Sequence, residues 1–211
     1  MKNSNVELMW STPNGEKLLG YMARVSNPKA KPEDSADKLI KYLIDHKHWS
    51  PFELVNVCMC IETTRDITRQ ILRHRSFSFQ EFSLRYSVAQ EFSLAECRLQ
   101  DTKNRQNSLE NSDKNLADRW EKMQDEVLTA AQKAYDDALE AGIAKELARK
   151  ILPEGLTWSR LYMNGTLRSW LHFIDVRTDP STQKEHREIA EKCRDIISTL
   201  YPNIVRKNAA E

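Results

Sequence analysis

Apolar and polar positions alternate most regularly between residues 55 and 62. The apolar positions of this stretch are Val55, Val57, Met59 and Ile61. A period of two residues is typical of a half-buried strand. Cys58 and Cys60 lie within this strand, and we expect them to be packed rather than reactive. A shorter apolar stretch at residues 6–10 predicts a second strand.

Elsewhere apolar residues recur every three or four positions, which predicts helices. The predicted helices cover residues 15–26, 35–46, 63–73, 115–140, 143–151, 156–174 and 183–200. The tetrapeptide Glu-Phe-Ser-Leu occurs at residues 81–84 and again at 91–94, and we expect the second copy to be an adjoining strand without a catalytic part. Because the predicted strands come early and the helices late, the pattern indicates an α+β fold.

The composition is that of an ordinary globular protein. The chain has 211 residues, of which 40% are hydrophobic and 30% charged, and its formal net charge is +1. This length suits a single domain, placed at residues 1–211, and the charge excludes a global attraction to nucleic acid or anionic membranes. No apolar run approaches the roughly 20 residues of a membrane span, and no signal peptide is evident, so we expect a cytoplasmic protein. Four cysteines without a Cys-x-x-Cys pair predict free thiols, not a zinc site or disulfides.

Positive charge is concentrated between residues 65 and 85, where only Asp66 and Glu81 are acidic. The basic residues of this segment are Arg65, Arg69, Arg73, His74, Arg75 and Arg85. Arginine presents a rigid fork of donors that matches phosphate oxygens, so converging arginines suit a nucleotide. The alternative for the arginines that recur every fourth position is a solvated helix face.

An Arg-His-Arg sequence at residues 73–75 is followed by seven residues and then by Ser83. This RHRx7S spacing resembles the signature of the flavin-dependent thymidylate synthases. Residues 48–53 and 168–183 also resemble segments of that family, and the resemblance covers roughly residues 48–190. It implies a single α+β domain with a central, mostly antiparallel sheet early in the chain and several long helices.

The resemblance further implies an enzyme that methylates dUMP to dTMP. The family takes its one-carbon unit from methylenetetrahydrofolate and its electrons from NADPH or NADH through FAD, without a cysteine nucleophile. It also implies a homotetramer with active sites shared between subunits. The protein would then supply orientation and charge while the flavin carries the redox chemistry.

Individual roles are implied by position within the family pattern. The residues implied to contact FAD are His48, Ser50, Glu53, Arg73, His74, Arg75, Glu81, Thr166, Arg168 and His172. The residues implied to bind dUMP are Gln70, Arg73, Glu81, Phe82, Ser83, Leu84, Arg85, Arg149 and Arg177. Gln70, Ser83, Arg85 and Arg149 would surround the ribose and phosphate. Arg177 is the catalytic candidate, because a cation against the pyrimidine stabilises negative charge that develops on the ring. Leu84 and Thr166 depart from the family, which often has a small residue at the first position and in some members asparagine at the second.

Several other interpretations compete with these roles. Ser83 could be a nucleophile, although the sequence indicates no base for it. His46 and His48 could bind a metal with His74 or His172, but no acidic residue stands at ligand spacing, and we predict no metal site. Phenylalanines between the arginines would suit a single-stranded nucleic-acid binding module. The apolar side of residues 115–140 would form core or a subunit interface, and we expect His186 to be solvated on a charged helix face.

Overall fold

A four-stranded antiparallel sheet forms the centre of the computed structural model, which describes residues 2–89 and 91–204. The strand order is β1-β2-β6-β3, with β1 at Asn5–Ser11, β2 at Asn56–Thr64, β6 at Trp158–Thr166 and β3 at Phe77–Glu81. The β2–β6 ladder is continuous over nine residues, from Asn56 opposite Thr166 to Thr64 opposite Trp158. The fold class and the antiparallel sheet expected from the sequence are confirmed.

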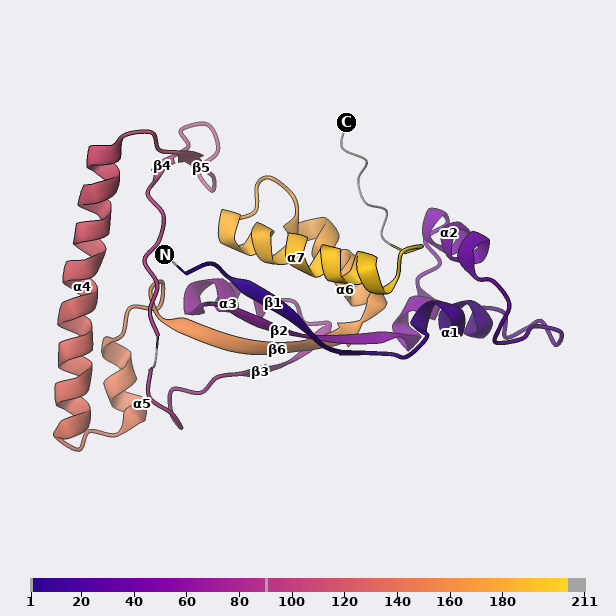
Figure 1. Ribbon diagram of the computed structural model, residues 1–211, viewed down its shortest axis with the longest axis horizontal. Helices are drawn as coiled ribbons and strands as arrows, with labels where there is room; N and C mark the ends of the chain where they lie inside the picture. Colours follow the sequence, from indigo (N-terminus) through magenta and orange to yellow (C-terminus); the bar gives the residue numbers. More distant parts are fainter. Residues whose placement is uncertain (1, 90, 205–211) are drawn as a thin grey trace.

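Helices cover the apolar face of this sheet. Figure 1 shows α6 (Leu167–Arg177) and α7 (Lys184–Leu200) lying over the strands, with α1 (Gly15–Met22) and α2 (Asp37–Asp45) grouped at one end. A short helix, α3 (Arg65–Ile71), follows β2 directly, and a 3-10 turn, η1 (Ser50–Leu54), precedes it. The fully buried side chains between the layers include Phe52, Met59, Ile61, Ile67, Leu161, Met163, Trp170 and Phe173.

A second, smaller unit of packing lies at the other end of the sheet (Figure 1). It combines the long helix α4 (Lys114–Glu140) with α5 (Lys145–Ala148) and the 3-10 turn η2 (Arg149–Ile151). The strands β4 (Arg98–Gln100) and β5 (Ser108–Glu110) form a separate two-stranded sheet before α4. The buried residues of the smaller unit are Leu84, Tyr135, Ala138, Ala148 and Leu152. The loop after β3 therefore packs against α4 and α5, which places residues 82–85 at this end.

Strand β6 corrects the sequence prediction most clearly, because residues 156–174 were expected to be one helix. Only Leu167–Arg177 is helical, and Trp158–Thr166 is an inner strand of the sheet. Ser159, Leu161, Met163 and Gly165 are buried in alternation, as a strand requires. Apolar residues at 158, 161 and 162 also fit a helical period, and pairing with β2 and β3 decides between the two.

Four smaller predictions are also wrong. The centre of β2 is buried on both faces, so Cys58 and Cys60 are packed as expected but the strand is not half-buried. Helix α3 begins at Arg65, not at residue 63, because Thr63 and Thr64 still pair with β6. Residues 91–94 contribute only one bridge, from Phe92 to Thr157, instead of a strand. His186 is completely buried, because α7 turns that side chain toward α3 and α6.

Candidate functional site

The Arg-His-Arg segment lies in the turn between α3 and β3. Arg73 and Arg75 are exposed, whereas His74 points inward beside Phe173, with ring centroids 5.0 Å apart. Arg177, the last residue of α6, donates from Nε to His74 Nε2 at 2.8 Å. Two candidates that are 103 positions apart in the sequence are therefore in direct contact.

Burial and neighbouring positive charges shift the pKa values of both His74 and Arg177. Burial, with the nearby charges of Arg177, His172 and Arg73, lowers the pKa of His74 to about 4. His74 is therefore neutral at pH 7, and its Nε2 lone pair accepts the arginine N–H. Burial and the charge of Arg73 also lower the pKa of Arg177. Its guanidinium is held at Nε by His74, and within residues 2–89 and 91–204 its terminal nitrogens make no side-chain hydrogen bond.

A second group of candidates surrounds the start of α6. Thr166 caps this helix: its hydroxyl accepts from the Ser169 backbone N–H at 3.3 Å and donates to Glu53 Oε2 at 2.7 Å. Arg168 donates to Glu53 Oε1 at 2.6 Å, and these two donors hold the pKa of the Glu53 carboxyl below its usual range. Thr166, one of the two positions that differ from the resembled family, therefore caps α6 and holds Glu53.

A hollow of about 480 Å³ adjoins this group. It is lined by Trp49, Glu53, Ser76, Arg168, Ser169, Leu171, His172 and Asp175. His48 and Ser50 are exposed just before and within η1, outside the lining of this hollow. Three of the FAD candidates, Glu53, Arg168 and His172, therefore face one cavity.

The third group lies beyond the opposite end of β3. Glu81 Oε1 accepts from Ser159 Oγ at 3.0 Å and pairs with Arg65 Nη1 at 3.1 Å. Leu84 and Arg149 line a hollow of about 280 Å³ together with Arg65 and four other polar or charged neighbours, Arg69, Lys150, Glu154 and Thr157. Ser83 and Arg85 line a separate hollow beside α5, where Arg85 pairs with Glu146 at 3.2 Å.

The strands separate these groups within one chain. Phe77 pairs with Gly165 and Glu81 with Leu161, so β3 carries the chain away from the end of β6 where α6 begins. Figure 1 shows α5 beyond one end of the sheet, whereas α6 starts from the other end of β6 and lies over the strands. The five residues of β3 span about 13 Å at about 3.3 Å per residue. The residues implied for dUMP thus divide between the Arg177 end and the Ser83 end of the same subunit.

Sequence reasoning missed several polar residues that support these candidates. Arg65 is 8% exposed and pairs with Glu81, so a solvated face is wrong for this arginine. Gln183 accepts a hydrogen bond from Gln70, and His186 contacts the other side of the same amide. Arg65 and Arg69 belong to the same four-residue repeat, so the sequence does not show that Arg65 is buried and Arg69 exposed. The difference arises from the loop that contains Glu154 and from the position of β3.

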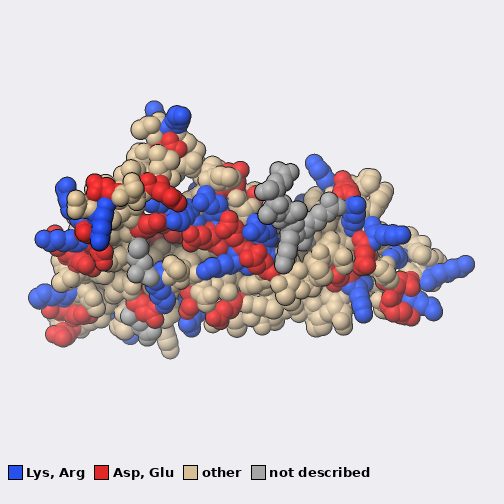
Figure 2. Space-filling view, turned by 45° about the horizontal axis from the view of Figure 1, so that its top comes forward, with Lys and Arg blue, Asp and Glu red and all other residues tan. Residues whose placement is uncertain are grey.

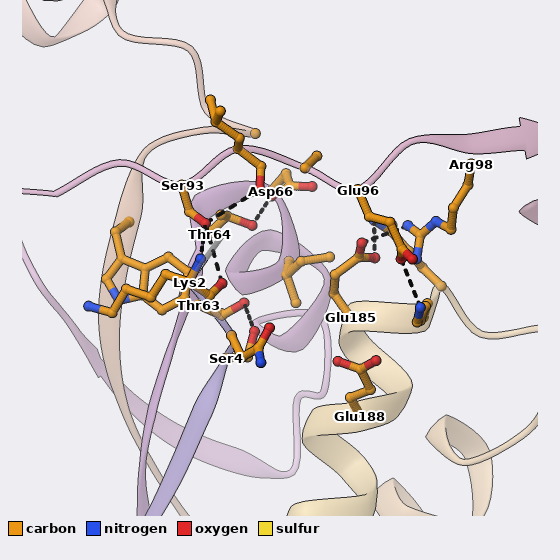
Figure 3. Close-up of a pocket in the computed structure, with 18 residues that line it drawn as sticks. Lys2, Ser4, Thr63, Thr64, Asp66, Ser93, Glu96, Arg98, Glu185 and Glu188 are labelled. Carbon is orange, nitrogen blue, oxygen red and sulfur yellow. Dashed lines mark hydrogen bonds and ion pairs between the residues drawn. The ribbon is translucent and has the colours of Figure 1, made fainter. Parts of the chain in front are cut away.

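Another hollow, of about 310 Å³, contains none of the candidates. Figure 3 shows it between the N-terminal strand, the start of α3 and the start of α7. Thr64 and Asp66 line one side, and Glu185 and Glu188 line the other. Gln183 also lines it and donates its own amide hydrogen to Glu185, so the hollow adjoins the candidate site through that residue.

The competing chemistries find little support in the described residues. Among residues 2–89 and 91–204, no group of three or more His, Cys, Asp or Glu side chains could hold a metal. Burial raises the pKa of the thiols of Cys58, Cys60 and Cys193, which disfavours the nucleophilic thiolate. Within the same ranges, no helix is long and apolar enough to cross a membrane.

A nucleic-acid binding surface is not supported. Arg65, Arg69 and Arg85 are paired with carboxylates of the same chain. Figure 2 shows positive and negative side chains interspersed over the face in view, without an extended basic stripe. A strand-binding groove requires a continuous positive track.

Comparisons with known proteins agree with the geometry. The family model described as thymidylate synthase complementing protein matches residues 7–203. A flavin-dependent thymidylate synthase from Synechocystis sp. is 50% identical over 189 residues, covering 90% of this chain and 87% of its own. A probable flavin-dependent thymidylate synthase from Paramecium bursaria Chlorella virus 1 is 45% identical, covering 90% and 89%. The crystal structure of a UMP/dUMP methylase from Streptomyces cacaoi, bound with 5-Br dUMP, matches with a TM-score of 0.85 and 26% identity, covering 97% of this chain and 93% of that one.

Proposed function

Since this chain belongs to the thymidylate synthase complementing protein family, that of the flavin-dependent thymidylate synthases, we propose that it methylates dUMP to dTMP. FAD would be the cofactor, with methylenetetrahydrofolate as carbon donor and NADPH as reductant. When bound, the flavin supplies the electrons that reduce the transferred one-carbon unit.

The contact between Arg177 and His74 is the observation that carries this proposal. The neutral His74 ring holds Arg177 Nε at 2.8 Å, so the two terminal nitrogens of the guanidinium keep one direction. Those nitrogens would face the uracil ring and stabilise negative charge that develops on it during transfer. Arginine acts here as an electrophile, because it does not lose its proton at working pH.

The proposed FAD site combines unpaired cations with a cavity. Arg73 and Arg75 are exposed and take no part in the ion pairs found within residues 2–89 and 91–204. Two free guanidinium groups match the two charges of the FAD diphosphate. The hollow at Trp49, Arg168 and His172 offers planar groups for the rings, so these residues fit a flavin nucleotide. The remaining proposed FAD contacts are His48, Ser50, Glu53, His74, Thr166 and Glu81.

The proposed dUMP site draws on both ends of the sheet. Gln70, Arg73 and Arg177 would contribute from the α3–α6 end, and Glu81, Phe82, Ser83, Leu84, Arg85 and Arg149 from the α5 end. Because β3 separates these groups, one nucleotide would contact two copies of the chain. Ser83 would be a ligand of the nucleotide: its Oγ accepts from the Arg85 backbone N–H at 3.3 Å.

A homotetramer with shared sites accounts for this division. Helix α4 also leaves apolar side chains in solvent in the single chain: Trp120 is 38% exposed, Met123 47% and Val127 56%. Contiguous exposed apolar side chains are typical of a protein–protein interface. We place the assembly in the cytoplasm, since its proposed substrates are small water-soluble metabolites.

Reconstitution of the purified protein with FAD tests the proposal. We expect a yellow protein that oxidises NADPH in a dUMP-dependent manner when methylenetetrahydrofolate is present. A protein that fails to bind added FAD would refute it, as would NADPH oxidation indifferent to dUMP.

A further inference from the structure

His186 is a buried polar residue to which the proposed function assigns no role. Its side chain is 0% exposed on α7, and its ring lies 5.7 Å from that of Phe173 and 6.4 Å from that of His74. Its Nδ1 lies 3.3 Å from Oε1 of Gln70, a proposed dUMP ligand. Its Nε2 has no hydrogen-bond partner within the described parts of the chain. A hydrophobic residue would fill this position without leaving such an atom unpaired.

Gln183 contacts the other side of the same amide. Gln70 Nε2 donates to Gln183 Oε1 at 2.7 Å, and Gln183 Nε2 donates to Glu185 Oε2 at 3.1 Å. The second oxygen of Glu185 accepts from Arg98 Nη2 at 2.6 Å. Figure 3 shows Arg98 on β4 and Glu185 on α7 pointing toward each other. The chain of hydrogen bonds therefore ends on a carboxylate that an arginine holds in place.

This carboxylate determines the direction of every bond in the chain. Ionised Glu185 only accepts, so the amide of Gln183 must turn its NH₂ group to it and its oxygen to Gln70. Gln70 must then turn its own NH₂ group to Gln183 and its oxygen to His186. That oxygen requires a donor, and His186 supplies it as the neutral tautomer protonated at Nδ1. Burial and the nearby charge of Arg177 lower the pKa of His186 to about 3, which keeps the ring neutral.

We propose that His186 is a positioning residue for the nucleotide: together with Gln183 it holds the Gln70 amide in a single orientation toward dUMP. The proposal rests on the function argued above, which places Gln70 against the nucleotide. An amide has two N–H donors and two lone pairs on its oxygen, and this network uses one of each. The remaining N–H and lone pair then point in one direction only. Without His186 only Gln183 opposes turning the amide over, which would set the two amide oxygens against each other.

Two substitutions of His186 separate this role from packing. His186→Asn keeps an N–H donor near the place of Nδ1, whereas His186→Leu keeps an apolar filling and removes the donor. In the FAD-loaded enzyme, loss of one oriented neutral hydrogen bond should raise KM for dUMP about 5- to 10-fold in His186→Leu. We expect kcat, flavin content and KM for NADPH to stay within about twofold, because uniform binding is what is lost. The asparagine variant should restore most of the KM.

Gln183→Leu is the second variant, because it releases the same amide from the other side and leaves His186 in place. It should reproduce the rise in KM even if His186→Leu fails to fold. Cys193→Ala is the matched control: Cys193 is also 0% exposed on α7, and we expect its substitution to leave KM unchanged. In a Gln70→Ala background, His186→Leu should have no further effect on KM, since positioning acts only through the amide.

The outcomes distinguish this inference from the proposed function. If the wild-type enzyme is active while His186→Leu and Gln183→Leu both keep the wild-type KM for dUMP, the positioning role is wrong and the function stands. An equal rise in KM in the Gln70→Ala background would also overturn it, by showing a general packing effect. If the wild-type protein neither binds dUMP by calorimetry nor turns it over, the proposed function fails, and the inference fails with it.

Discussion

Acidification from pH 7 to pH 5 should destabilise the fold through its two buried neutral histidines. The pKa of His186 is lowered from 6.5 to about 3 and that of His74 to about 4. A histidine whose pKa is lowered by folding binds more protons in the unfolded state than in the folded state. Its contribution to the free energy of unfolding is therefore complete above pH 6.5 and is lost as the pH falls toward its pKa in the folded state. At pH 5 an unfolded histidine is about 97% protonated, whereas the folded His186 is still neutral. The resulting loss between pH 7 and pH 5 is about 2 kcal/mol for His186, and it is smaller for His74, which is only partly buried.

Urea unfolding of the FAD-free protein at a fixed concentration measures this loss at the two pH values. The free energy of unfolding should fall by about 2 kcal/mol more in the wild type than in His186→Leu, because one titrating group has been removed. Carboxyls with lowered pKa values, such as Glu53 and Glu185, titrate below the range from pH 5 to pH 7. The contributions of other carboxyls are the same in both proteins and cancel when the two losses of free energy are compared. Cys193→Ala should keep the full wild-type pH dependence. If His186→Leu and the wild type lose the same free energy, His186 is not a buried neutral donor and the reasoning is refuted.

Three other substitutions test separate parts of the account. Arg177→Ala should lower dTMP formation about 10²- to 10³-fold with the flavin still bound, the size expected for one preorganised charge donor; near-normal turnover would show that the role is assigned wrongly. Arg65→Met should lower the free energy of unfolding by about 3–5 kcal/mol, because it leaves Glu81 without its cation in a site where Arg65 is only 8% exposed; an unchanged urea midpoint would contradict the buried pair. Val127→Glu places a charge on the exposed apolar side of α4, and sedimentation should show dissociation of the assembly with unchanged subunit helicity; an intact tetramer would remove α4 from the proposed interface.

The sequence predicted the local patterns well and the long-range pairings poorly. Helix α4 and strand β2 follow from periods that need no information about neighbours, and both lie within a few residues of the expected bounds. Strand β6 was assigned to a helix because its apolar spacing fits both periods, and its state depends on ladders to β2 and β3. Burial of Cys58 and Cys60 on the second face of β2 likewise depends on what packs over that face, which the alternating pattern does not contain.

In the candidate site, too, local patterns were predicted from the sequence and long-range contacts were not. His74 and Arg177 were named from a motif, and the structure shows them in contact because the turn after α3 meets the end of α6. His186 was assigned to solvent and a solvated face was the alternative for Arg65, since a charged or polar residue on a mixed helix face gives no sign of a buried partner. Their partners, Glu81 and Gln70, are 16 and 116 residues away and are brought close only by β3 and α7.

Formation of dTMP by the purified protein is the decisive test of the proposed flavin-dependent methylation of dUMP. The protein would be incubated with dUMP, methylenetetrahydrofolate and NADPH, with and without FAD, and the nucleotides separated by chromatography. We predict dTMP in the presence of FAD and only background amounts after the flavin has been removed, with recovery on adding it back. Equal dTMP formation with and without flavin would contradict the account, and so would no dTMP from a protein that is fully loaded with FAD.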